Sequence, residues 1–405
     1  MVIGIVGGGA SGMAAAWAAS QNENNQIFLF ERQARLGRKL LATGNGRCNL
    51  TNLHASIQHF HGDDSSFAQT ALENYTPEKI LSWFESLGLL TVSEDSGRVY
   101  PYSDQANSVV DCLRFALERK NIQTILGCEI AKIRKVGQQF CLETKDDKYL
   151  CDRLIVACGG LAGTKLGGSL SGYRLLNKLG HKSNDLRPAL VQLKSSWNGC
   201  VGLKGVRCNC AIKILHNGKL FSKSAGELQF TEYGLSGPVI FEVSRDVCRE
   251  KGCWEAKIDF MPQYSHEKIM ELLTAKWHTQ LTCGDLLTGI VHNRLGRMLC
   301  KTAGISLDSP ISSLDNIDLQ NLAHMLKGFY AEITEPLGMD SAQVTAGGVL
   351  TSQFNRQTME SNLTPGLYAC GEVLDIDGDC GGYNLHWAWA SGLTAGINAG
   401  KESHD

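Results

Sequence analysis

The chain has 405 residues, of which 43% are hydrophobic and 20% charged, and its formal net charge is −2. This is the composition of an ordinary soluble globular protein with room for two or three domains. The charge balance argues against a globally basic nucleic-acid-binding protein, and no apolar run approaches the roughly 20 residues of a membrane span.

The first predicted elements are a strand at 2–6, a glycine turn and a helix. Gly7, Gly9 and Gly12 match G-x-G-x-x-G, and a second strand, QIFLFE, ends at Glu31, 19 residues beyond the last glycine. In a dinucleotide-binding fold these glycines permit a tight turn, a close diphosphate and close helix–strand packing, and the acid binds a ribose diol. The pattern predicts a Rossmann unit. The alternatives are a turn without nucleotide and a solvated acid at a strand end.

The stretch LLATGNGRCNLTN at 40–52 lacks apolar periodicity, and its Gly and Asn residues favour left-handed backbone. It predicts an ordered loop that presents amides and one guanidinium. From Arg32 to Gly62 there are five Lys or Arg residues and no Asp or Glu. Beside a nucleotide motif, this favours neutralisation of a diphosphate, with Arg38 and Lys39 placed to meet it. A solvated basic face is the alternative.

Helical patterns at 77–88 and 106–120 precede a run of strand-like segments at 122–126, 128–136, 139–144 and 149–157. We expect these strands to form a small antiparallel meander that returns to an apolar strand with paired glycines, LIVACGG. That layout is typical of two-dinucleotide-binding flavoproteins rather than NAD dehydrogenases. A second full G-x-G-x-x-G is absent, so NAD(P)H is expected only as a transient electron donor.

The middle of the chain, 187–262, contains alternating segments such as GELQFTEYGLSGPVIFEVS and a hairpin signal, HNGK. These predict a β-rich, barrel-like domain. Residues 263–328 follow a helical pattern and predict a helical insert, and 329–345 predict a strand that returns to the middle domain. An FAD-binding domain is then expected from 1–186 and 346–405.

Residues 186–226 contain seven basic residues and no acidic one, namely Arg187, Lys194, Lys204, Arg207, Lys213, Lys219 and Lys223. This local positive field could attract a phosphorylated or polynucleotide partner. Alternatively, lysines at alternate strand positions simply face water and discourage edge pairing.

The far end of the chain, GLYACGEVLDIDGDCGGYNLHWAWASGLTAG, predicts a strand that closes on Gly371 and Glu372 and a glycine turn that opens a helix. In two-dinucleotide flavoproteins the acid after such a strand bonds the ribityl chain. The helix N-terminus faces the edge of the flavin that becomes negative on reduction. FAD is therefore the expected cofactor. Asp375 or Asp377 could share the role of Glu372, because many of these proteins have Asp rather than Glu there.

Six motifs make the chain resemble the bacterial BaiN/YhiN-type family of NAD(P)/FAD-dependent oxidoreductases: GGGASGMAAA, GRKLLATGNGRCNLTN, GRVYPYSDQANSVVD, GELQFTEYGLSGP, VTAGGV and GLYACGEVLDIDGDCGGYNLHWAWASG. The resemblance implies an α/β fold: a Rossmann-like FAD-binding domain from both chain ends, an inserted β-rich domain and a helical insert. It also implies reduction of a carbonyl-conjugated C=C bond, in a steroid-type enone or in a uracil of ribosomal RNA.

The residues expected to bind FAD lie in the glycine turn, the 40–52 loop and the C-terminal motif: Gly7, Gly9, Ser11, Gly12, Glu31, Arg32, Arg38, Lys39, Asn45, Gly46, Arg47, Asn49, Ile130, Gly159, Gly371, Glu372, Asp375, Gly382, Asn384 and Leu385. The candidate catalytic residues are Cys48, as a thiol that titrates near neutrality, and Tyr383 and His386. Tyr383 and His386, together with Tyr100 and Trp387, are expected to line the substrate side of the flavin. The alternative is that these residues only pack.

Fifteen cysteines occur without a CxxC pair, and the opening VIGIVGGG has no basic n-region or cleavage site. We therefore expect a cytoplasmic protein whose cysteines are mostly small buried hydrophobic residues. A redox disulfide between Cys370 and Cys380 is an alternative, and no metal cluster is expected.

Three functions remain open. The first is an FAD reductase of C=C bonds acting on RNA or a small molecule, and the second is a flavin oxidase or monooxygenase. The third is an RNA-binding protein with structural FAD. Steep salt dependence would indicate phosphate contacts.

Overall fold

The computed structural model describes residues 1–118 and 122–402, and the chain forms two compact units. The first joins Met1–Arg187 to Gln343–Asp405, and the second is Pro188–Ala342. The helix expected at 106–120 is described from Ala106 to Glu118, and its last two expected positions lie outside the described residues. None of the helices in the described ranges is long and apolar enough to cross a membrane.

Five parallel strands form the central sheet of the first unit, in the order β20-β11-β1-β2-β7. They are β1 (Val2–Val6), β2 (Gln26–Glu31), β7 (Ile122–Leu126), β11 (Arg153–Val156) and β20 (Leu367–Ala369). Gly4 of β1 pairs with Leu154 on one side and Phe28 on the other. Since β20 belongs to the C-terminal part of the chain, both ends of the sequence build one sheet, and the expected Rossmann-type α/β fold is confirmed.

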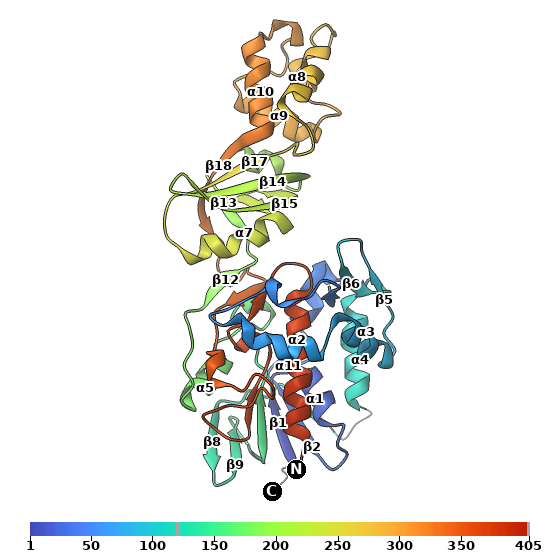
Figure 1. Cartoon of the computed structure of the whole chain (residues 1–405), viewed down its shortest axis with the longest axis vertical. Helices are drawn as coiled ribbons and strands as arrows, with labels where there is room; N and C mark the ends of the chain where they lie inside the picture. The colour runs from blue at the N-terminus through green and yellow to red at the C-terminus, as the bar shows by residue number, and fades with distance from the viewer. Residues whose placement is uncertain (119–121, 403–405) are drawn as a thin grey trace. The chain divides into compact units, whose positions relative to one another are not determined.

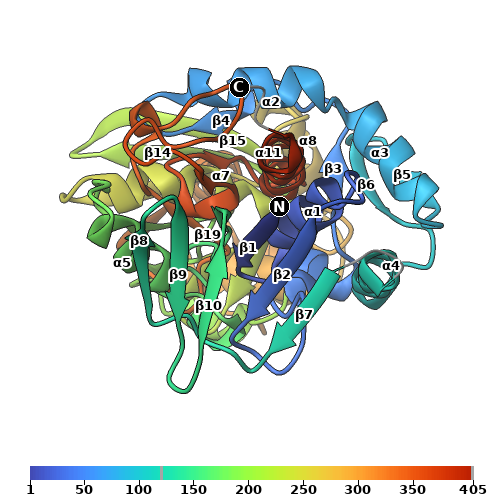
Figure 2. The same cartoon turned by 90° about the horizontal axis from the view of Figure 1, so that it is seen from below.

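The first and last helices of the chain, α1 (Ala10–Ala19) and α11 (Tyr383–Gly400), pack together on one face of this sheet (Figure 2). A Cβ added at Gly392 would lie 2.4 Å from the carbonyl oxygen of Ser11, and one at Gly396 would lie 2.3 Å from that of Ala15. Two glycines four positions apart share one helix face. Only glycine at these positions lets the two backbones approach so closely.

Smaller elements surround this core, as Figure 1 shows. Their bounds are α2 (Gln69–Asn74), α3 (Pro77–Ser86), α4 (Ala106–Glu118), α5 (Ser171–Lys178), β3 (Thr51–Asn52), β4 (Phe60–His61), β5 (Thr91–Ser93), β6 (Arg98–Pro101), β8 (Lys132–Val136), β9 (Gln139–Glu143), β10 (Lys148–Cys151), β19 (Val344–Ala346) and β21 (Asp377–Gly378). The short strand β12 (Arg187–Ala189) includes the boundary between the two units. The expected meander is confirmed for β8, β9 and β10. It is wrong for 122–126, because β7 pairs in parallel with β2 and extends the central sheet.

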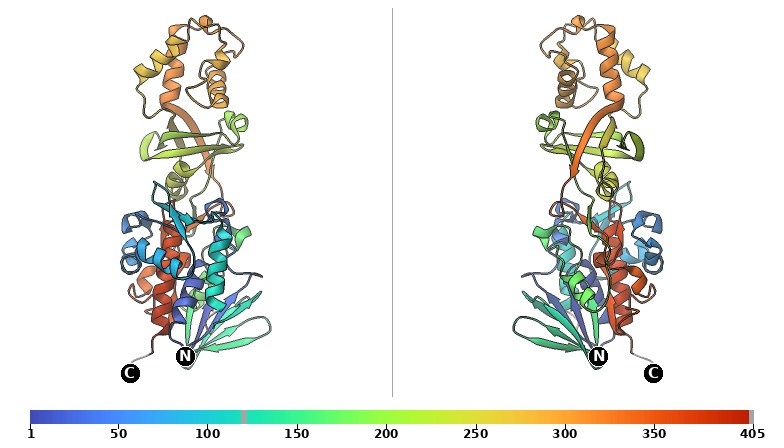
Figure 3. Two further views of the ribbon diagram at one scale, coloured as in Figure 1. Left: turned by 90° about the vertical axis from the view of Figure 1, so that its right-hand side faces the viewer. Right: turned by 90° about the vertical axis from the view of Figure 1, so that its left-hand side faces the viewer.

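The second unit is built on a closed barrel in the order β13-β16-β15-β14-β17-β18. Its elements are β13 (Leu193–Ser195), α6 (Gly199–Leu203), β14 (Arg207–His216), β15 (Lys219–Thr231), β16 (Gly234–Ser236), α7 (Pro238–Arg249), β17 (Trp254–Asp259), α8 (His266–Ala275), α9 (Asn293–Thr302), α10 (Asn316–Gly328) and β18 (Phe329–Pro336). Helices α8, α9 and α10 gather beyond one end of the barrel strands (Figure 1 and Figure 3).

Two local predictions for this unit have opposite outcomes. Asn217 (φ 51°) and Gly218 (φ 77°) occupy the turn between β14 and β15, as the hairpin signal predicts. The alternating pattern expected through PVIFEVS is wrong, because these residues begin α7 with proline in its first turn. Val239, Val243 and Val247 are buried at helical spacing, so their apolar period is that of a helix face.

Candidate cofactor and active site

Of the three motif glycines in the turn after β1, only Gly9 has open space beside its Cα. A Cβ at Gly7 (φ 113°) would lie 2.3 Å from the carbonyl oxygen of Ala157, and one at Gly12 would lie 1.8 Å from that of Gly7. A Cβ at Gly9 would meet nothing within 4 Å. Gly9 is the N-cap of α1, and no side chain caps this helix. Unfilled space therefore faces the positive end of the helix, where an anion is stabilised.

Glu31 lies at the carboxyl end of β2, beside this turn. Its Oε2 accepts a hydrogen bond of 2.8 Å from the backbone N–H of Gly8, and its Oε1 accepts one of 2.7 Å from that of Gln33. The carboxylate is thus oriented by backbone donors rather than by a cation. Ile130 is buried in the segment after β7, the strand next to β2.

Two arginines expected to bind FAD are held by neutral oxygen atoms. Arg32 donates to the carbonyl oxygen of Gly167 at 2.6 Å, and Arg38 donates to Gln33 Oε1 at 2.7 Å. Neither forms an ion pair with a described residue. Gly159 (φ 69°) also faces open space, with nothing within 4 Å of an added Cβ. The two arginines thus lack an ion-pair partner among the described residues, and Gly159 leaves unfilled volume.

The loop at 40–52 is ordered by left-handed backbone at Gly44, Asn45, Gly46 and Cys48, with φ values of 57°, 57°, 86° and 64°. Asn45 and Gly46 are exposed, and a Cβ at Gly46 would meet nothing within 4 Å. The irregular but ordered backbone agrees with the prediction from the sequence. Whether Asn45 and Gly46 contact a cofactor stays a prediction.

Arg47, expected near the cofactor, is engaged by acidic side chains. It bonds to Asp104, lies 3.2 Å from Glu94 Oε1, and places its guanidinium over the ring of Tyr100 at 3.9 Å. The hydrogen bond to Asp104, helped by that to Glu94, outweighs burial and raises the pKa of Arg47 above its usual value. The loop is thereby attached to the segment around β6, an arrangement that the sequence alone did not suggest.

Asn49 is a partly buried polar residue whose Oδ1 atom is buried and is an unused acceptor. Its Oδ1 has no hydrogen-bond partner among the described residues. A Cβ at Gly382 would lie 2.9 Å from this atom and 2.4 Å from the carbonyl oxygen of Thr51. Gly382 (φ 103°) is the N-cap of α11, and no side chain caps that helix either. An unpartnered acceptor thus lies beside a second uncapped helix N-terminus.

Other residues of the C-terminal motif hold the turns in place. Gly371 (φ 76°) donates its N–H to Ser391 Oγ at 2.9 Å, and a Cβ there would lie 2.5 Å from Ser11 Oγ. Asn384 accepts from the N–H of Gly378 at 2.8 Å and donates to its carbonyl oxygen at 2.7 Å. Leu385 packs against the hydrophobic core. Asn384 and Leu385 therefore have structural partners of their own.

The three C-terminal acids have different surroundings. Glu372 bonds to Lys39 Nζ at 2.8 Å and accepts the N–H of Thr345 at 2.8 Å. Asp375 is buried and accepts from Asn184 Nδ2 at 2.7 Å. Asp377 is buried in β21. Glu372 therefore remains the acid linked to the basic loop after β2.

All three candidate catalytic residues are buried, Cys48 and His386 with no exposed surface and Tyr383 with 7%. Burial raises the pKa of Cys48 to about 12, which removes the reason for proposing it, titration near neutrality. His386 Nδ1 lies 2.8 Å from Thr51 Oγ1, and burial lowers the pKa of His386 to about 4. Its imidazole is neutral at pH 7 and is a poor general acid.

The aromatic candidates lie at the start of α11. Tyr383 stacks on His59, with ring centroids 4.5 Å apart, and contacts the edge of Phe60. Trp387 is buried and donates to the carbonyl oxygen of Gly371 at 3.2 Å, so it packs. Cys370 and Cys380, the pair suggested for a redox disulfide, are not joined to each other by a disulfide bond.

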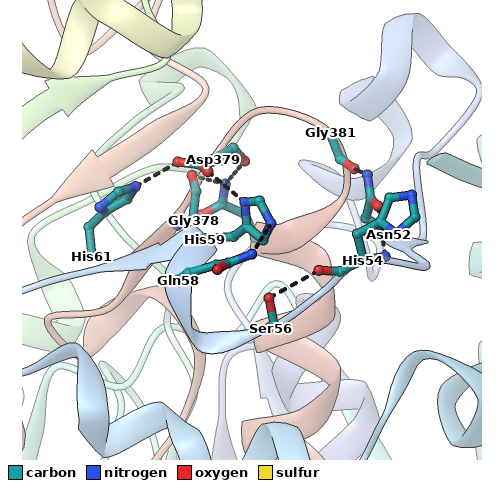
Figure 4. A network of polar contacts seen from close by, with 10 residues as sticks. Asn52, His54, Ser56, Gln58, His59, His61, Gly378, Asp379 and Gly381 are labelled. Atoms are coloured by element: carbon teal, nitrogen blue, oxygen red, sulfur yellow. Dashed lines mark hydrogen bonds and ion pairs between the residues drawn. The ribbon is translucent and has the colours of Figure 1, made fainter. Parts of the chain in front are cut away.

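The sequence analysis did not predict a set of polar contacts that involves Asp379, four residues before the start of α11 (Figure 4). His59 Nδ1 lies 2.9 Å from Asp379 Oδ2, and His61 Nε2 lies 2.6 Å from Asp379 Oδ1. Burial raises the pKa of Asp379, but the hydrogen bonds from the two histidines outweigh it, so the pKa is below its usual value. The signal was the H-x-H spacing, because alternate residues of an extended segment share a side.

These features fit a dinucleotide with a flavin ring at one end. Open space lies at Gly9 and Gly159, an orphaned acceptor lies at Asn49, and both α1 and α11 start without a side-chain cap. Within the described ranges, no group of three or more His, Cys, Asp or Glu side chains has an arrangement that could hold a metal ion.

Comparisons with known proteins agree with this geometry. A family model described as the HI0933-like protein Rossmann domain matches residues 1–398. The 3-dehydro-bile acid delta(4,6)-reductase of Clostridium scindens is 38% identical, over 98% of this chain and 99% of that protein. The ribosomal RNA dihydrouridine synthase of Escherichia coli is 30% identical, over 96% of this chain and 95% of that protein.

A solved structure of similar fold is the 3-ketosteroid delta1-dehydrogenase of Sterolibacterium denitrificans in complex with 1,4-androstadiene-3,17-dione. The match covers 98% of this chain and 99% of the dehydrogenase chain, with a TM-score of 0.51. At 11% sequence identity, this likeness concerns the fold alone.

Proposed function

The chain belongs to the HI0933-like Rossmann family and is an FAD-dependent oxidoreductase, and we propose that it reduces a C=C bond conjugated to a carbonyl group. The electrons come from NADH or NADPH. The balance is one nicotinamide nucleotide and one proton consumed per double bond saturated, with a hydride added to one carbon and a proton to its neighbour.

The observation that carries this proposal is the cradle built from both chain ends, with uncapped N-termini at α1 and α11 and the buried, unpartnered Asn49 Oδ1. Gly9 and the first turn of α1 would hold the diphosphate, and Glu31 the ribose of the adenosine. The first turn of α11 and Asn49 would hold the ring end. When bound, FAD supplies a two-electron carrier able to deliver hydride.

Tyr383 is the residue that we assign to the proton. The burial of Cys48 and the low pKa of His386 disfavour both as donors near pH 7. Tyr383 opens the helix that would face the ring, and its side chain stacks on His59, which Asp379 holds. In this role Tyr383 Oη gives a proton to the carbon next to the one that receives hydride, and regains it from solvent.

Two kinds of substrate present the same electronic problem. One relative is named as a reductase of 3-dehydro-bile acid delta(4,6) compounds and another as a ribosomal RNA dihydrouridine synthase. A 3-oxo-4-ene and the C5=C6 bond of uracil are both carbonyl-conjugated, so one active site chemistry could serve either. Stabilising charge on the carbonyl oxygen is the shared requirement.

The test is an anaerobic two-step experiment on purified protein loaded with FAD. NADH and NADPH are compared for bleaching of the yellow flavin, and a 3-oxo-4-ene steroid or unmodified ribosomal RNA is then added. We expect return of the yellow colour with a mass gain of two hydrogen atoms in the substrate. Return only with oxygen would instead indicate an oxidase or monooxygenase. Absence of bleaching with either nucleotide would indicate a structural flavin.

A further inference from the structure

Three lysines lie in a row across neighbouring strands of the barrel. Lys213 of β14 pairs directly with Lys223 of β15 on one side and with Lys257 of β17 on the other. Directly opposite residues point to the same face of a sheet. Since Ile212 and Ile214 are buried inside the barrel, this face is the outer one.

The three side chains have no carboxylate partner among the described residues, unlike three other basic residues of the second unit. Lys194, Lys204 and Arg207 lie 2.6, 2.7 and 3.5 Å from the carboxylates of Glu335, Glu232 and Glu227. Within the described part of the chain, no ion pair involves any lysine of the row. The positive charge expected from the basic run is therefore neutralised at some positions and left unpaired at others, which include Lys213 and Lys223 of the row and also Lys219.

Protection of a sheet edge does not explain these lysines. Each strand of a closed barrel is paired on both sides, and β14 pairs with both β15 and β17. Such a barrel has no edge to protect. Like charges directly opposite each other also destabilise a sheet. A ligand that brings negative charge would remove this repulsion.

Acidic side chains lie close to two of the three lysines, because Glu255 and Asp259 pair directly with Leu215 and Ala211 and are therefore diagonal neighbours of Lys213 as well. Glu255 and Asp259 are two residues to either side of Lys257 on β17. Asp259 is itself bonded to Lys327 at 2.6 Å. The part of the row on β14 and β15 has no such neighbour on its own strands between Arg207 and Gly226.

An exposed aromatic residue continues the row. Tyr330 of β18 pairs directly with Lys257, whose Nζ lies 4.9 Å from the ring centroid, and Tyr330 is 53% exposed. Cations that follow a backbone next to an aromatic face on which a base can stack are the pattern of single-stranded nucleic-acid binding. An anionic membrane would use the cations but has no base to stack on the ring.

We propose that the row Lys223, Lys213 and Lys257, with Tyr330, is a docking surface for single-stranded RNA that contacts its phosphates and stacks one base. This inference rests on the proposed function and narrows its substrate to a uracil within RNA. The row lies within the second unit, so it would hold the RNA chain rather than the reacting base.

The experiment compares two triple variants of the full FAD-loaded protein. The first is Lys213→Gln, Lys223→Gln and Lys257→Gln. The second, its control, is Lys194→Gln, Lys204→Gln and Arg207→Gln, which makes the same change in net charge at residues already paired with glutamates. The probe is a single-stranded fragment of ribosomal RNA, and its affinity is measured across a salt series. Flavin content and melting temperature check folding.

For the row variant we expect roughly tenfold or greater loss of affinity and a salt slope lower by about 2, as three lost phosphate contacts require. The control should stay close to wild type. Tyr330→Ala should weaken binding about fivefold or more, with rescue by Tyr330→Phe.

Equal losses in the two triple variants, or no RNA binding by the wild type at low salt, would overturn the proposal. So would binding of phosphatidylglycerol vesicles that the row variant loses while RNA binding persists. Bleaching of the bound flavin by NADH or NADPH, and reduction of either a 3-oxo-4-ene steroid or ribosomal RNA by the wild type, are measured separately. Failure of bleaching, or of reduction of both substrates, counts against the proposed function, whereas the RNA-binding results count only against the docking surface.

Discussion

Lys39 Nζ lies 2.8 Å from Glu372 Oε2, so an ion pair joins the loop after β2 to the turn before α11 across 333 positions of sequence. Both side chains are partly exposed, so the pair itself contributes little to stability. Its position is more informative, because it joins the two chain segments that we propose bind FAD.

We predict that Glu372→Ala weakens FAD binding about tenfold, because a hydrogen bond to a charged group contributes roughly 1.5–3 kcal/mol. The dissociation constant is measured by flavin fluorescence. Lys39→Gln, which removes the ion pair and keeps the carboxylate, should have a smaller effect. A lower melting temperature with unchanged FAD affinity would show that Glu372 only fastens the turn.

Gly9→Ala should lose at least about tenfold in FAD affinity while the FAD-free protein folds normally. The added methyl group meets nothing in the chain, but it would occupy the space where a diphosphate approaches the backbone. The matched control is Gly338→Ala, since a Cβ there also meets nothing within 4 Å. Retention of flavin by the Gly9 variant would mean that the open space serves another purpose.

Tyr383→Phe should slow reoxidation of the reduced flavin by substrate about 100-fold, the order of magnitude of a lost general acid. The measurement is stopped-flow absorbance in H₂O and D₂O, because loss of the proton donor also changes the solvent isotope effect. Cys48→Ala provides the contrast: as a buried packing residue it should lower stability and leave the isotope effect as in the wild type. A fully active Tyr383→Phe variant would assign the ring to packing.

His386 should make the protein less stable in mild acid. Burial lowers its pKa from 6.5 to about 4 in the folded state. Between these values the unfolded chain binds more protons, so stability is present above pH 6.5 and is lost as the pH falls toward 4. For this group alone, the loss between pH 7 and pH 5 is about 2 kcal/mol.

Urea unfolding at the two pH values tests this expectation. In His386→Asn the loss between pH 7 and pH 5 should be smaller than in the wild type by about 2 kcal/mol. His278→Asn, a change at an exposed histidine, should follow the wild type. An identical pH dependence in the His386 variant and the wild type would show that His386 is not neutral in the fold.

Local features were predictable from the chain itself. The turn at Gly7, Gly9 and Gly12 and the acid at the end of β2 follow from contiguous residues, because backbone conformation and strand alternation act over a few positions. The hairpin at Asn217 and Gly218 belongs to the same class. The association of the two chain ends was predicted from two local motifs, the glycine turn after the first strand and the strand, turn and helix near the C-terminus.

Tertiary structure decided the remaining features, because each depends on a neighbour far away in sequence. The pairing of β7 with β2, the burial of Cys48 and His386, and the contact of His59 with Asp379 all arise from such neighbours. The cross-strand row of lysines is equally invisible in a linear chain. Sequence determined which groups are present and their local backbone, whereas burial and register determined which of them carry charge and meet each other.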